Sequence, residues 1–330
     1  MESSTHPYSE LTPDRVVLAM ENLGLAPDAR IYPLNSYENR VYQIGLEGGS
    51  SVVAKFYRPA RWSDAQILEE HAFAQELLDL EVPVAAPMQF ANGQTLMHDG
   101  IFRIAVFPKI AGRAPDLGES DNMLIMGRYI GRVHLIGVKS PFLTRETLSI
   151  ESMAIASREY LLENNFIPTE LLPAYESLTV DLIDRITSRF KETGELTQFR
   201  LHGDCHLGNV LWQSDIPHFV DFDDAIMGPA IQDLWMLLSG ERDQKQAQLL
   251  ELIEGYNEFF EFRPQELNLI ESLRTLRIIK YSAWLARRWE DPAFPRTFPW
   301  FNTERYWAEH ILELREQMAA LDEPQLRLIF

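Results

Sequence analysis

The sequence predicts an α+β protein of two lobes, with an N-terminal antiparallel sheet plus one helix and a mostly helical C-terminal lobe. Short runs of β-branched and aromatic residues, separated by turn signals, dominate the first third of the chain. Apolar residues recur at helical spacing over most of the remainder. With 330 residues, the chain is long enough for two lobes. We expect the N-lobe to cover residues 1–110 and the C-lobe residues 111–330.

The composition is ordinary for a globular protein, with 46% hydrophobic and 24% charged residues. The formal net charge of -19 argues against nucleic acid and anionic membranes as partners, because these are bound largely through clustered Lys and Arg. The single cysteine, Cys205, excludes an internal disulfide. The chain has no apolar run of transmembrane length, and residues 1–10 lack the basic and apolar regions of a signal peptide. A cytoplasmic location is therefore expected.

The N-lobe is expected to begin with a helix over Pro13–Leu23. Two β-rich runs, Arg40–Leu46 and Ser51–Tyr57, surround the turn Glu47-Gly48-Gly49 and predict a β-hairpin. The polar loop NSYEN, residues 35–39, precedes this hairpin. Further strands are expected at residues 88–91, 94–97 and 102–107, with Asn92-Gly93 as a turn between the first two.

Lys55 in the second strand of the hairpin follows Val-Val-Ala, which is typical of the kinase strand that carries a phosphate-binding lysine. An exposed strand lysine is the alternative. Ser63 and Gln66 form a capping-box pattern that predicts a helix ending near Leu80. Glu70 falls within the apolar stripe of this helix. Because a buried carboxylate needs a cation, we predict that Glu70 pairs with Lys55 and holds it against nucleotide phosphates.

The apolar run from Ile104 to Ile110 ends in Gly112, after which the composition becomes helical. We interpret this run as the hinge between the lobes. Backbone groups near Phe107 and Lys109 would then meet the edge of an adenine ring. An ordinary crossover between domains is the alternative interpretation.

The polar segment that follows residue 199 contains His202-x-Asp204, then Asn209 five residues after the aspartate, and Asp221 at the end of an apolar strand. Two short β-rich runs around a polar turn predict a hairpin that brings Asp204, Asn209 and Asp221 together. Phosphoryl transfer requires a carboxylate near the acceptor hydroxyl, and an amide and a second carboxylate that hold magnesium ions. The spacing matches the kinase catalytic loop, so we assign Asp204 as the base. We assign Asn209 and Asp221 as Mg²⁺ ligands, with Asp221 also essential for catalysis.

Another interpretation of the same segment is a transition-metal site made by His202, Cys205 and His206, whose imidazole and thiolate groups suit such ions. Gly203 argues against a helix that presents both histidines on one face, and no second Cys/His cluster completes a tetrahedral set. Cys205 adjoins the base, so the sequence leaves open either a redox switch or a buried, inert thiol.

In the C-lobe, a helix beginning near Asp121 places His134 on a face with small residues, which is typical of a core histidine. Asp233 enters an apolar helix and is expected to accept hydrogen bonds from the backbone of the catalytic loop. A basic and aromatic helix over residues 274–289 is either half-buried with a solvated edge or a wall that faces the substrate. The proline-rich segment 291–301 is expected to be an ordered loop. Other helical segments are expected at residues 152–164 and 169–192.

The motifs LHGDCHLGN, VDFDDA and GPAIQDLW resemble the aminoglycoside phosphotransferase and choline kinase branch of the protein-kinase-like fold. PLNSYENRVYQ, VAKFYRP, ILEEHAFAQEL and DPAFPRTFPW are more closely similar to the bacterial stress response kinase A family, and this similarity spans almost the whole chain. The resemblance implies a bilobal kinase that uses ATP and Mg²⁺ to phosphorylate Ser or Thr of proteins, itself included, in a bacterial stress response. It also implies that Ser36 contacts the nucleotide.

Two positions depart from ordinary protein kinases. Gly203 replaces the usual arginine of the catalytic loop, which puts control through an Arg-bound activation-loop phosphate in doubt. The NSYEN loop lacks the glycine-rich signature, so Ser36 and Asn39 are expected to share contacts that bare backbone usually makes.

The leading hypothesis is a monomeric Ser/Thr protein kinase. A kinase acting on a hydroxylated metabolite or antibiotic is the first alternative, because the same catalytic loop serves both acceptor classes. A pocket closed by residues 281–289 would favour the small molecule, and an open cleft a peptide. A nucleotide-binding pseudokinase is a third hypothesis, although Lys55, Asp204, Asn209 and Asp221 are all present.

Overall fold

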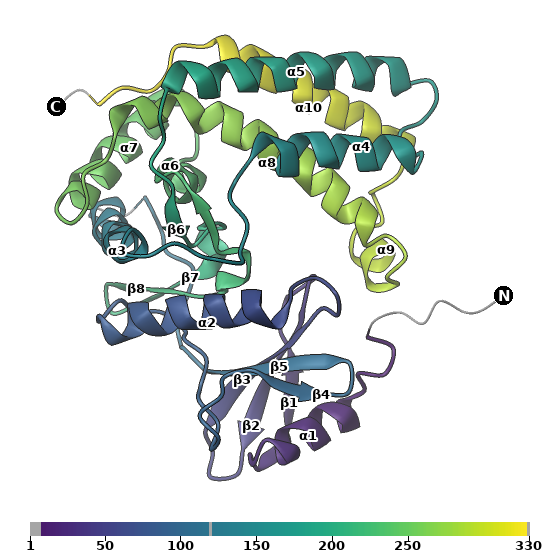
Figure 1. The fold of residues 1–330 in the computed structure, drawn as a ribbon, viewed down its shortest axis with the longest axis vertical. Helices are drawn as coiled ribbons and strands as arrows, with labels where there is room; N and C mark the ends of the chain where they lie inside the picture. The colour runs from purple at the N-terminus through teal and green to yellow at the C-terminus, as the bar shows by residue number, and fades with distance from the viewer. Residues whose placement is uncertain (1–7, 119–120, 329–330) are drawn as a thin grey trace.

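The computed structural model describes residues 8–118 and 121–328 and shows an α+β protein of two lobes (Figure 1). The N-terminal part of the chain, coloured purple to blue, forms a curved antiparallel sheet, and helices make up most of the rest. The predicted fold class is confirmed. Residues 1–7, which form most of the segment inspected for a signal peptide, lie outside the described residues. Among the described helices, none combines the length and the apolar character that a membrane span requires.

The N-lobe sheet has the strand order β1-β2-β3-β5-β4, and every neighbouring pair is antiparallel. One part of its core forms against α1, where Met20 of the helix and Ile44 of the sheet are fully buried in the same cluster. The elements are α1 (Pro13–Asn22), β1 (Pro27–Pro33), β2 (Arg40–Leu46), β3 (Ser51–Tyr57), α2 (Asp64–Asp79), β4 (Met97–Asp99) and β5 (Phe102–Pro108).

The elements that carry Lys55 and Glu70 form as the sequence predicts. The β2–β3 hairpin has the expected bounds, and Lys55 lies opposite Val41 of β2 and Ala105 of β5, in the middle of the sheet. The capping box at the start of α2 is also present. The Ser63 hydroxyl accepts a hydrogen bond from the Gln66 backbone N–H, and the Gln66 side chain accepts one from the Ser63 N–H.

Two predictions about the N-lobe strands were wrong. Residues 88–91 and 94–97 do not form a hairpin of strands. The Phe90 N–H donates to the Gln94 carbonyl (2.8 Å), so Asn92-Gly93 makes the expected turn, but the next strand begins only at Met97. Strand β1 was missed. It contains two prolines and pairs irregularly with β2, so its local pattern is weak.

The C-lobe packs its helices around two short two-stranded sheets, β6–β9 and β7–β8. Helices α3 and α7 approach closely at Gly127, where an added Cβ would overlap the Leu252 carbonyl oxygen. A π-helical turn (Glu151–Ile155) leads into α4. The elements are α3 (Asn122–Gly137), α4 (Ala156–Glu163), α5 (Leu172–Thr193), β6 (Phe199–Leu201), β7 (Val210–Gln213), β8 (Ile216–Phe219), β9 (Ile226–Gly228), α6 (Ile231–Leu234), α7 (Arg242–Asn257), α8 (Ile270–Arg287), α9 (Ala293–Thr297) and α10 (Glu304–Asp322).

The segment 291–301 is not a loop throughout, as the sequence led us to expect, because it contains the short helix α9. Pro292 caps the helix and Pro295 lies in its first turn. The first N–H groups of a helix have no intrahelical partner, so proline at these positions costs no hydrogen bond. The high proline content of this segment therefore does not exclude a helix, because Pro292 and Pro295 lie at the start of α9.

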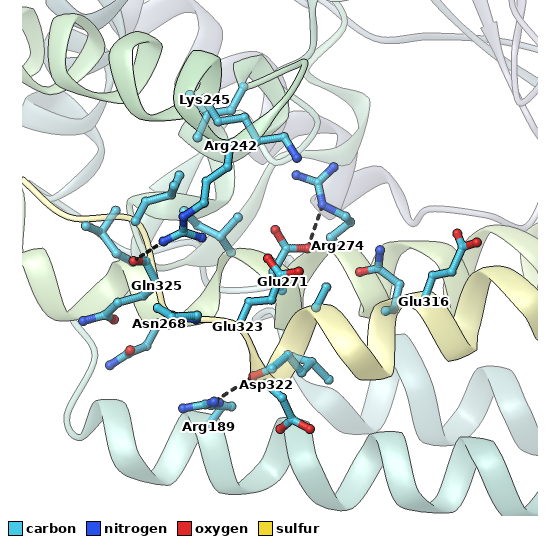
Figure 2. Close-up of a pocket in the computed structure, with 18 of the residues that line it drawn as sticks. Arg189, Arg242, Lys245, Asn268, Glu271, Arg274, Glu316, Asp322, Glu323 and Gln325 are labelled. Atoms are coloured by element: carbon cyan, nitrogen blue, oxygen red, sulfur yellow. Dashed lines mark hydrogen bonds and ion pairs between the residues drawn. The ribbon is translucent and has the colours of Figure 1, made fainter.

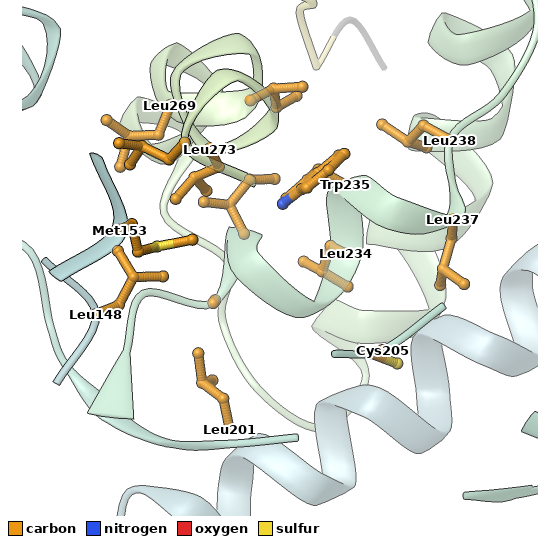
Figure 3. Packing of buried hydrophobic residues seen from close by; sticks show 14 of the residues in the cluster. Leu148, Met153, Leu201, Cys205, Leu234, Trp235, Leu237, Leu238, Leu269 and Leu273 are labelled. Atoms are coloured by element: carbon orange, nitrogen blue, oxygen red, sulfur yellow. The ribbon is translucent and has the colours of Figure 1, made fainter. Parts of the chain in front are cut away.

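One large apolar core anchors the strand that precedes the catalytic loop. Leu201 of β6, Leu234 of α6 and Leu273 of α8 have no exposed surface and belong to the same cluster. Figure 3 shows these side chains, with Cys205 at the edge of the group. The polar catalytic loop thus emerges from a rigid apolar support.

Candidate active site

The predicted catalytic loop, residues 202–209, joins β6 to the β7–β8 hairpin. Asp204 lies in this loop, Asn209 ends a short 3-10 turn, and Asp221 follows β8. The Asn209 side-chain amide donates to the Asp204 carbonyl (3.0 Å), and the Val220 N–H donates to the Asn209 carbonyl (3.0 Å). These bonds bring Asp204, Asn209 and Asp221 to one end of the hairpin, as the sequence predicts.

Asp233 holds the start of this loop. Its carboxylate accepts the backbone N–H groups of His202 and Gly203, each at 2.8 Å, which confirms the predicted supporting role. His134 lies 3.1 Å from the same carboxylate and 2.7 Å from the Tyr256 hydroxyl. His134 is fully buried, so it is a core histidine with satisfied ring nitrogens, also as predicted.

Glycine is required at position 203 by two independent features. Its φ of +84° lies in the left-handed region, and an added Cβ would overlap the Asp224 carbonyl oxygen. The arginine that protein kinases usually carry at this point of the loop would not fit. The backbone of the catalytic loop instead packs directly on the segment that follows Asp221.

Lys55 is buried and lies close to three carboxylates. Its Nζ atom lies 3.0 Å from Asp221, 3.0 Å from Asp223 and 3.6 Å from Glu70, so the predicted pair with Glu70 is present. Burial alone would lower the pKa of Lys55, but the three carboxylates raise that pKa well above its ordinary value. The lysine therefore keeps its positive charge although it is buried.

Glu70 is held between two cations, Lys55 and Arg145, whose Nη1 atom lies 3.9 Å from the second carboxylate oxygen. That oxygen is buried and accepts no hydrogen bond from the described part of the chain. Burial raises the pKa of Glu70 to about 7, and the nearby Asp223 carboxylate adds to the rise that Lys55 opposes. Its neighbour Glu69 faces away from the stripe and accepts the backbone N–H groups of residues 143–145.

Arg61 and the two aspartates after Phe222 are site residues that the sequence interpretation missed. Arg61 extends from the segment between β3 and α2 and donates to Asp223 and, at 2.6 Å, to Asp224. Burial would raise the pKa of Asp223, but Arg61 and Lys55 hold it below its ordinary value. The available signal was the acidic run Asp221-Phe222-Asp223-Asp224 next to a buried strand, since acids in such a place need cations.

The NSYEN loop is tied to helix α8 of the C-lobe through Glu38. The Glu38 carboxylate accepts from the Trp284 indole N–H (2.5 Å) and from Arg288 (3.0 Å), and it pairs with Arg58 (3.0 Å). The Asn39 side chain is buried and accepts the Arg58 backbone N–H (3.0 Å), so it stabilises the lobe itself. The loop therefore bridges the two lobes in this structure.

Ser36 lies in the same loop, where its hydroxyl donates to the Asn39 carbonyl (3.2 Å). It lines a cavity of about 210 Å³ between the loop and α9. Phe107 lies opposite Val53 in the sheet and is half-buried, and Lys109 is exposed just beyond β5. Ser36 therefore lies beside α9, whereas Phe107 and Lys109 lie at the end of β5 and do not line the same cavity.

Asp204 is paired with a cation from helix α8. Its Oδ1 atom accepts from Arg277 (2.5 Å), and its Oδ2 atom lies 3.4 Å from His206. Burial would raise the pKa of Asp204, but His206 and Arg277 hold it below its ordinary value. The carboxylate is ionised and has the charge that a proton acceptor needs, while Arg277 occupies one of its oxygens.

The geometry does not support the transition-metal interpretation. The His202 ring contacts the Val220 carbonyl (2.9 Å), and His206 Nδ1 accepts the Gly208 N–H (2.9 Å). Over residues 8–118 and 121–328, no group of three or more His, Cys, Asp or Glu side chains is arranged to hold a metal ion. Cys205 is buried, and burial raises its thiol pKa well above the ordinary value, which is typical of an inert thiol.

A larger cavity, of about 960 Å³, lies elsewhere in the C-lobe, between α7, α8, α10 and the C-terminal segment (Figure 2). Acidic and basic side chains line this cavity, and several of them already form hydrogen bonds within the protein. Arg274 donates to Glu271 (3.1 Å), and Arg242 donates to the Gln325 carbonyl (2.9 Å). None of the residues that we predicted for the site lines this cavity. The candidate active site is therefore identified by its chemistry and not by cavity size.

Sequence relatives match almost the whole chain. Stress response kinase A of Escherichia coli K12 is 47% identical over 328 residues, covering 99% of each chain. Serine/threonine protein kinase RdoA of Salmonella typhimurium LT2 is 44% identical, again with 99% of each chain covered. The model of the phosphotransferase enzyme family matches residues 30–268, a range that includes all the predicted site residues.

Solved structures share the fold at low sequence identity. The amicoumacin kinase hAmiN in complex with AMP-PNP, Ca²⁺ and Ami has a TM-score of 0.72 at 20% identity, covering 93% of this chain and 94% of that one. A microcompartment-associated aminopropanol kinase has a TM-score of 0.71 at 17% identity, with 95% and 100% covered. These likenesses show the fold, and the family model and the sequence relatives show that the chain belongs to the phosphotransferase enzyme family and, within it, to the stress response kinase A proteins.

Proposed function

We propose that this protein is an ATP- and Mg²⁺-dependent Ser/Thr protein kinase that acts in the cytoplasm as part of a bacterial stress response. The observation that carries the proposal is the convergence of Lys55 on Glu70 (3.6 Å) and Asp221 (3.0 Å) beside a loop that presents Asp204 and Asn209. Phosphoryl transfer uses the same groups to bind phosphates, hold the metal and orient the acceptor. The names of the sequence relatives support the protein substrate class.

On the nucleotide side, Lys55 would contact the phosphates and Glu70 would hold the lysine in place. The adenine would lie against the segment that links the lobes, near Phe107 and Lys109, with the lobe boundary at about residue 110. Ser36 would contact the nucleotide from the NSYEN loop. Glu38 already ties this loop to α8, which supports a phosphate site that the loop covers on one side.

The residues present fit a magnesium ion. Asn209 and Asp221 offer the hard oxygen ligands that Mg²⁺ prefers, and the Asp221 side chain is 50% exposed at the end of the hairpin. Mg²⁺ would neutralise the phosphate charge that develops during transfer. The nearby carboxylate of Asp223 is less available to a metal ion, because it already pairs with Lys55 and Arg61.

Asp204 would orient the acceptor hydroxyl and take its proton. The acceptor oxygen then bonds to the γ-phosphorus of ATP as the bond to the bridging oxygen breaks, and ADP leaves. In the present arrangement Arg277 occupies one Asp204 oxygen, so an acceptor hydroxyl that approaches this oxygen would compete with Arg277.

A kinase of small hydroxylated molecules is the second candidate. It is favoured by the stacked pair Tyr281 and Trp284, with ring centroids 5.6 Å apart, which offers a flat aromatic surface on the same helix as Arg277. The exposed fractions of Tyr281 (42%) and of the Arg277 side chain (44%) instead favour an open wall suited to a peptide. We rank the protein acceptor first because it agrees with the relatives' names.

Terminally labelled ATP tests the choice. The purified full-length chain is incubated with labelled ATP and Mg²⁺, with Asp204→Asn as the control, and labelled residues are mapped by mass spectrometry. We expect label on Ser or Thr that is absent from the control. No label on the chain or on added protein substrates, together with intact ATP binding, would contradict the protein-kinase function and favour a small acceptor.

A further inference from the structure

Helix α8 presents an exposed, positively charged face next to the candidate base. Arg277, Lys280 and Tyr281 are exposed and lie on one side of the helix, at the spacing of neighbouring residues on a helix surface. Arg277 reaches Asp204, and further along the helix Trp284 and Arg288 reach Glu38 of the NSYEN loop. The face of α8 therefore runs along the acceptor side of the site, from the base to the loop.

The contact between Arg277 and Asp204 is suited to exchange. The Arg277 side chain is 44% exposed, and exposed ion pairs are weak because water competes for both partners. Its guanidinium holds Asp204 Oδ1, while Oδ2 faces His206 and the Asn209 amide. An acceptor hydroxyl that approaches Asp204 Oδ1 would therefore compete with Arg277.

The carboxylates around this face already have other partners. Asp224 pairs with Arg61, and Glu38 pairs with Arg58 and Arg288. Burial raises the pKa of Asp224, and its negative charge is stabilised mainly by Arg61 and more weakly by Lys280. Lys280 forms no ion pair of its own with any carboxylate in the described part of the chain. Once Arg277 leaves Asp204, Arg277 and Lys280 would be two neighbouring cations without an ion pair of their own.

We propose that Arg277 and Lys280 bind an anionic group, a carboxylate or a phosphate, that flanks the acceptor Ser or Thr of a peptide substrate. The same group draws Arg277 away from Asp204, so that the base becomes available only when such an acceptor is bound. This inference rests on the proposed protein-kinase function and specifies its substrate class. A polycationic acceptor would instead meet like charge along α8.

Four peptides test this inference. They share one sequence with a single acceptor Thr and differ only at one flanking position, which is Ala, Glu, phosphoserine or Lys. Each is assayed with the purified full-length chain, Mg²⁺ and labelled ATP, and kcat and KM are determined separately. We expect kcat/KM to be about tenfold or more higher for the Glu and phosphoserine peptides than for the Ala peptide, with the Lys peptide lowest. Similar kcat/KM values for the Glu and phosphoserine peptides would show that the site recognises any anionic side chain. A clear advantage for phosphoserine would show that it recognises a phosphate group.

Variants of α8 separate recognition from a general effect on the enzyme. In the double variant Arg277→Gln, Lys280→Gln we expect the peptide preference to fall to within about twofold. In Arg277→Gln alone we expect kcat for the Ala peptide to rise, because Asp204 is no longer occupied, and Arg277→Lys should restore the preference in part. Arg287→Gln is the matched control, since Arg287 lies on the same helix but donates to the Ala156 carbonyl (3.0 Å) and stacks over Tyr160.

The outcomes distinguish this inference from the proposed function. Equal kcat/KM for all four peptides in the unmodified protein would overturn the anionic acceptor site while leaving the kinase function intact. A preference that survives in the double variant would also overturn it, because another part of the chain would then read the charge. If neither peptides nor proteins are labelled although ATP binds, the protein-kinase function itself fails, and this inference fails with it.

Discussion

The two halves of the candidate active site, the nucleotide side around Lys55 and the acceptor side around Asp204, hold their charges in opposite ways. On the proposed nucleotide side, Lys55 is 6% exposed and lies within 3.6 Å of three carboxylates, two of which, Asp223 and Glu70, also pair with Arg61 and Arg145. On the acceptor side, Asp204 faces a cation, Arg277, that is 44% exposed. Buried, multiply paired charges have few alternative partners, whereas an exposed pair exchanges readily with water or ligand.

This difference suggests how the two substrates are treated. The nucleotide side is organised in advance, so ATP would find its lysine already positioned and charged. On the proposed acceptor side, Arg277 occupies one Asp204 oxygen, and we expect an incoming acceptor to replace this contact. A kinase built in this way would bind nucleotide without an acceptor, and its base would be freed only by an acceptor that can attract Arg277.

The largest expected effect comes from removing the buried cation. In Lys55→Met the carboxylates of Glu70, Asp221 and Asp223 lose their shared partner, so we expect the free energy of unfolding to fall by about 3–5 kcal/mol and transfer to be lost. Urea denaturation measures the first effect and labelled ATP the second. Lys139→Met, at an exposed lysine after α3, should change stability by no more than about 0.5 kcal/mol. A loss under about 1 kcal/mol in Lys55→Met would mean that the nucleotide side is not held by this cluster.

Asp221→Asn tests the metal side with a smaller effect. We expect nucleotide affinity in the presence of Mg²⁺ to fall by about tenfold or more, which corresponds to about 1.4 kcal/mol or more, because the metal loses a charged ligand. In EDTA the variant and the unmodified protein should bind nucleotide alike. Asp215→Asn, at the exposed turn of the same hairpin, is the control. Identical magnesium titrations of Asp221→Asn and the unmodified protein would remove Asp221 from the metal site.

The pH dependence of stability tests the buried state of Glu70. Its pKa is raised from an ordinary 4.5 to about 7, so the folded chain binds a proton that the unfolded chain releases between these values. The free energy of unfolding should therefore fall as pH rises from about 4.5 to 7. In Glu70→Gln this fall should be smaller by an amount on the order of 1 kcal/mol. Glu47→Gln, at an exposed turn, serves as the control, and parallel curves for Glu70→Gln and the unmodified protein would contradict the assignment.

The smallest effect on stability is expected on the acceptor side. Because the Arg277 side chain is exposed, Arg277→Gln should change the free energy of unfolding by about 0–1 kcal/mol. Urea denaturation beside Lys55→Met gives the comparison directly. A loss as large as that of Lys55→Met would show that Arg277 is part of the fixed structure and that the two halves do not differ as described.

Local signals in the sequence predicted much of the fold. The β2–β3 hairpin follows from two β-rich runs around a Gly-Gly turn, and the start of α2 follows from the Ser63–Gln66 capping box. The pairing of Glu70 with Lys55 followed from helical periodicity, since a carboxylate in an apolar stripe requires a cation. Strand β1 and α9 could not be found in this way because prolines obscure their local patterns.

The cations that distinguish the two halves were harder to predict. Arg61 lies 162 residues before Asp223, and Arg277 lies 73 residues after Asp204. Neither pairing has a periodic or motif-based signal, because it depends on how the lobes and α8 pack around the site. The sequence showed that α8 was basic, but only the packing shows that Arg277 points at the base.

Single-turnover transfer by Asp204→Asn, measured together with nucleotide binding, tests the central claim most directly. Asparagine keeps the shape of the side chain but cannot take the acceptor proton. We predict that the transfer rate falls by about 10²–10⁴-fold while the Kd for ATP and Mg²⁺ changes by less than about threefold, because the base belongs to the acceptor side alone. A near-normal transfer rate would remove Asp204 from the chemistry. An equal loss of nucleotide binding would contradict the separation of the two halves.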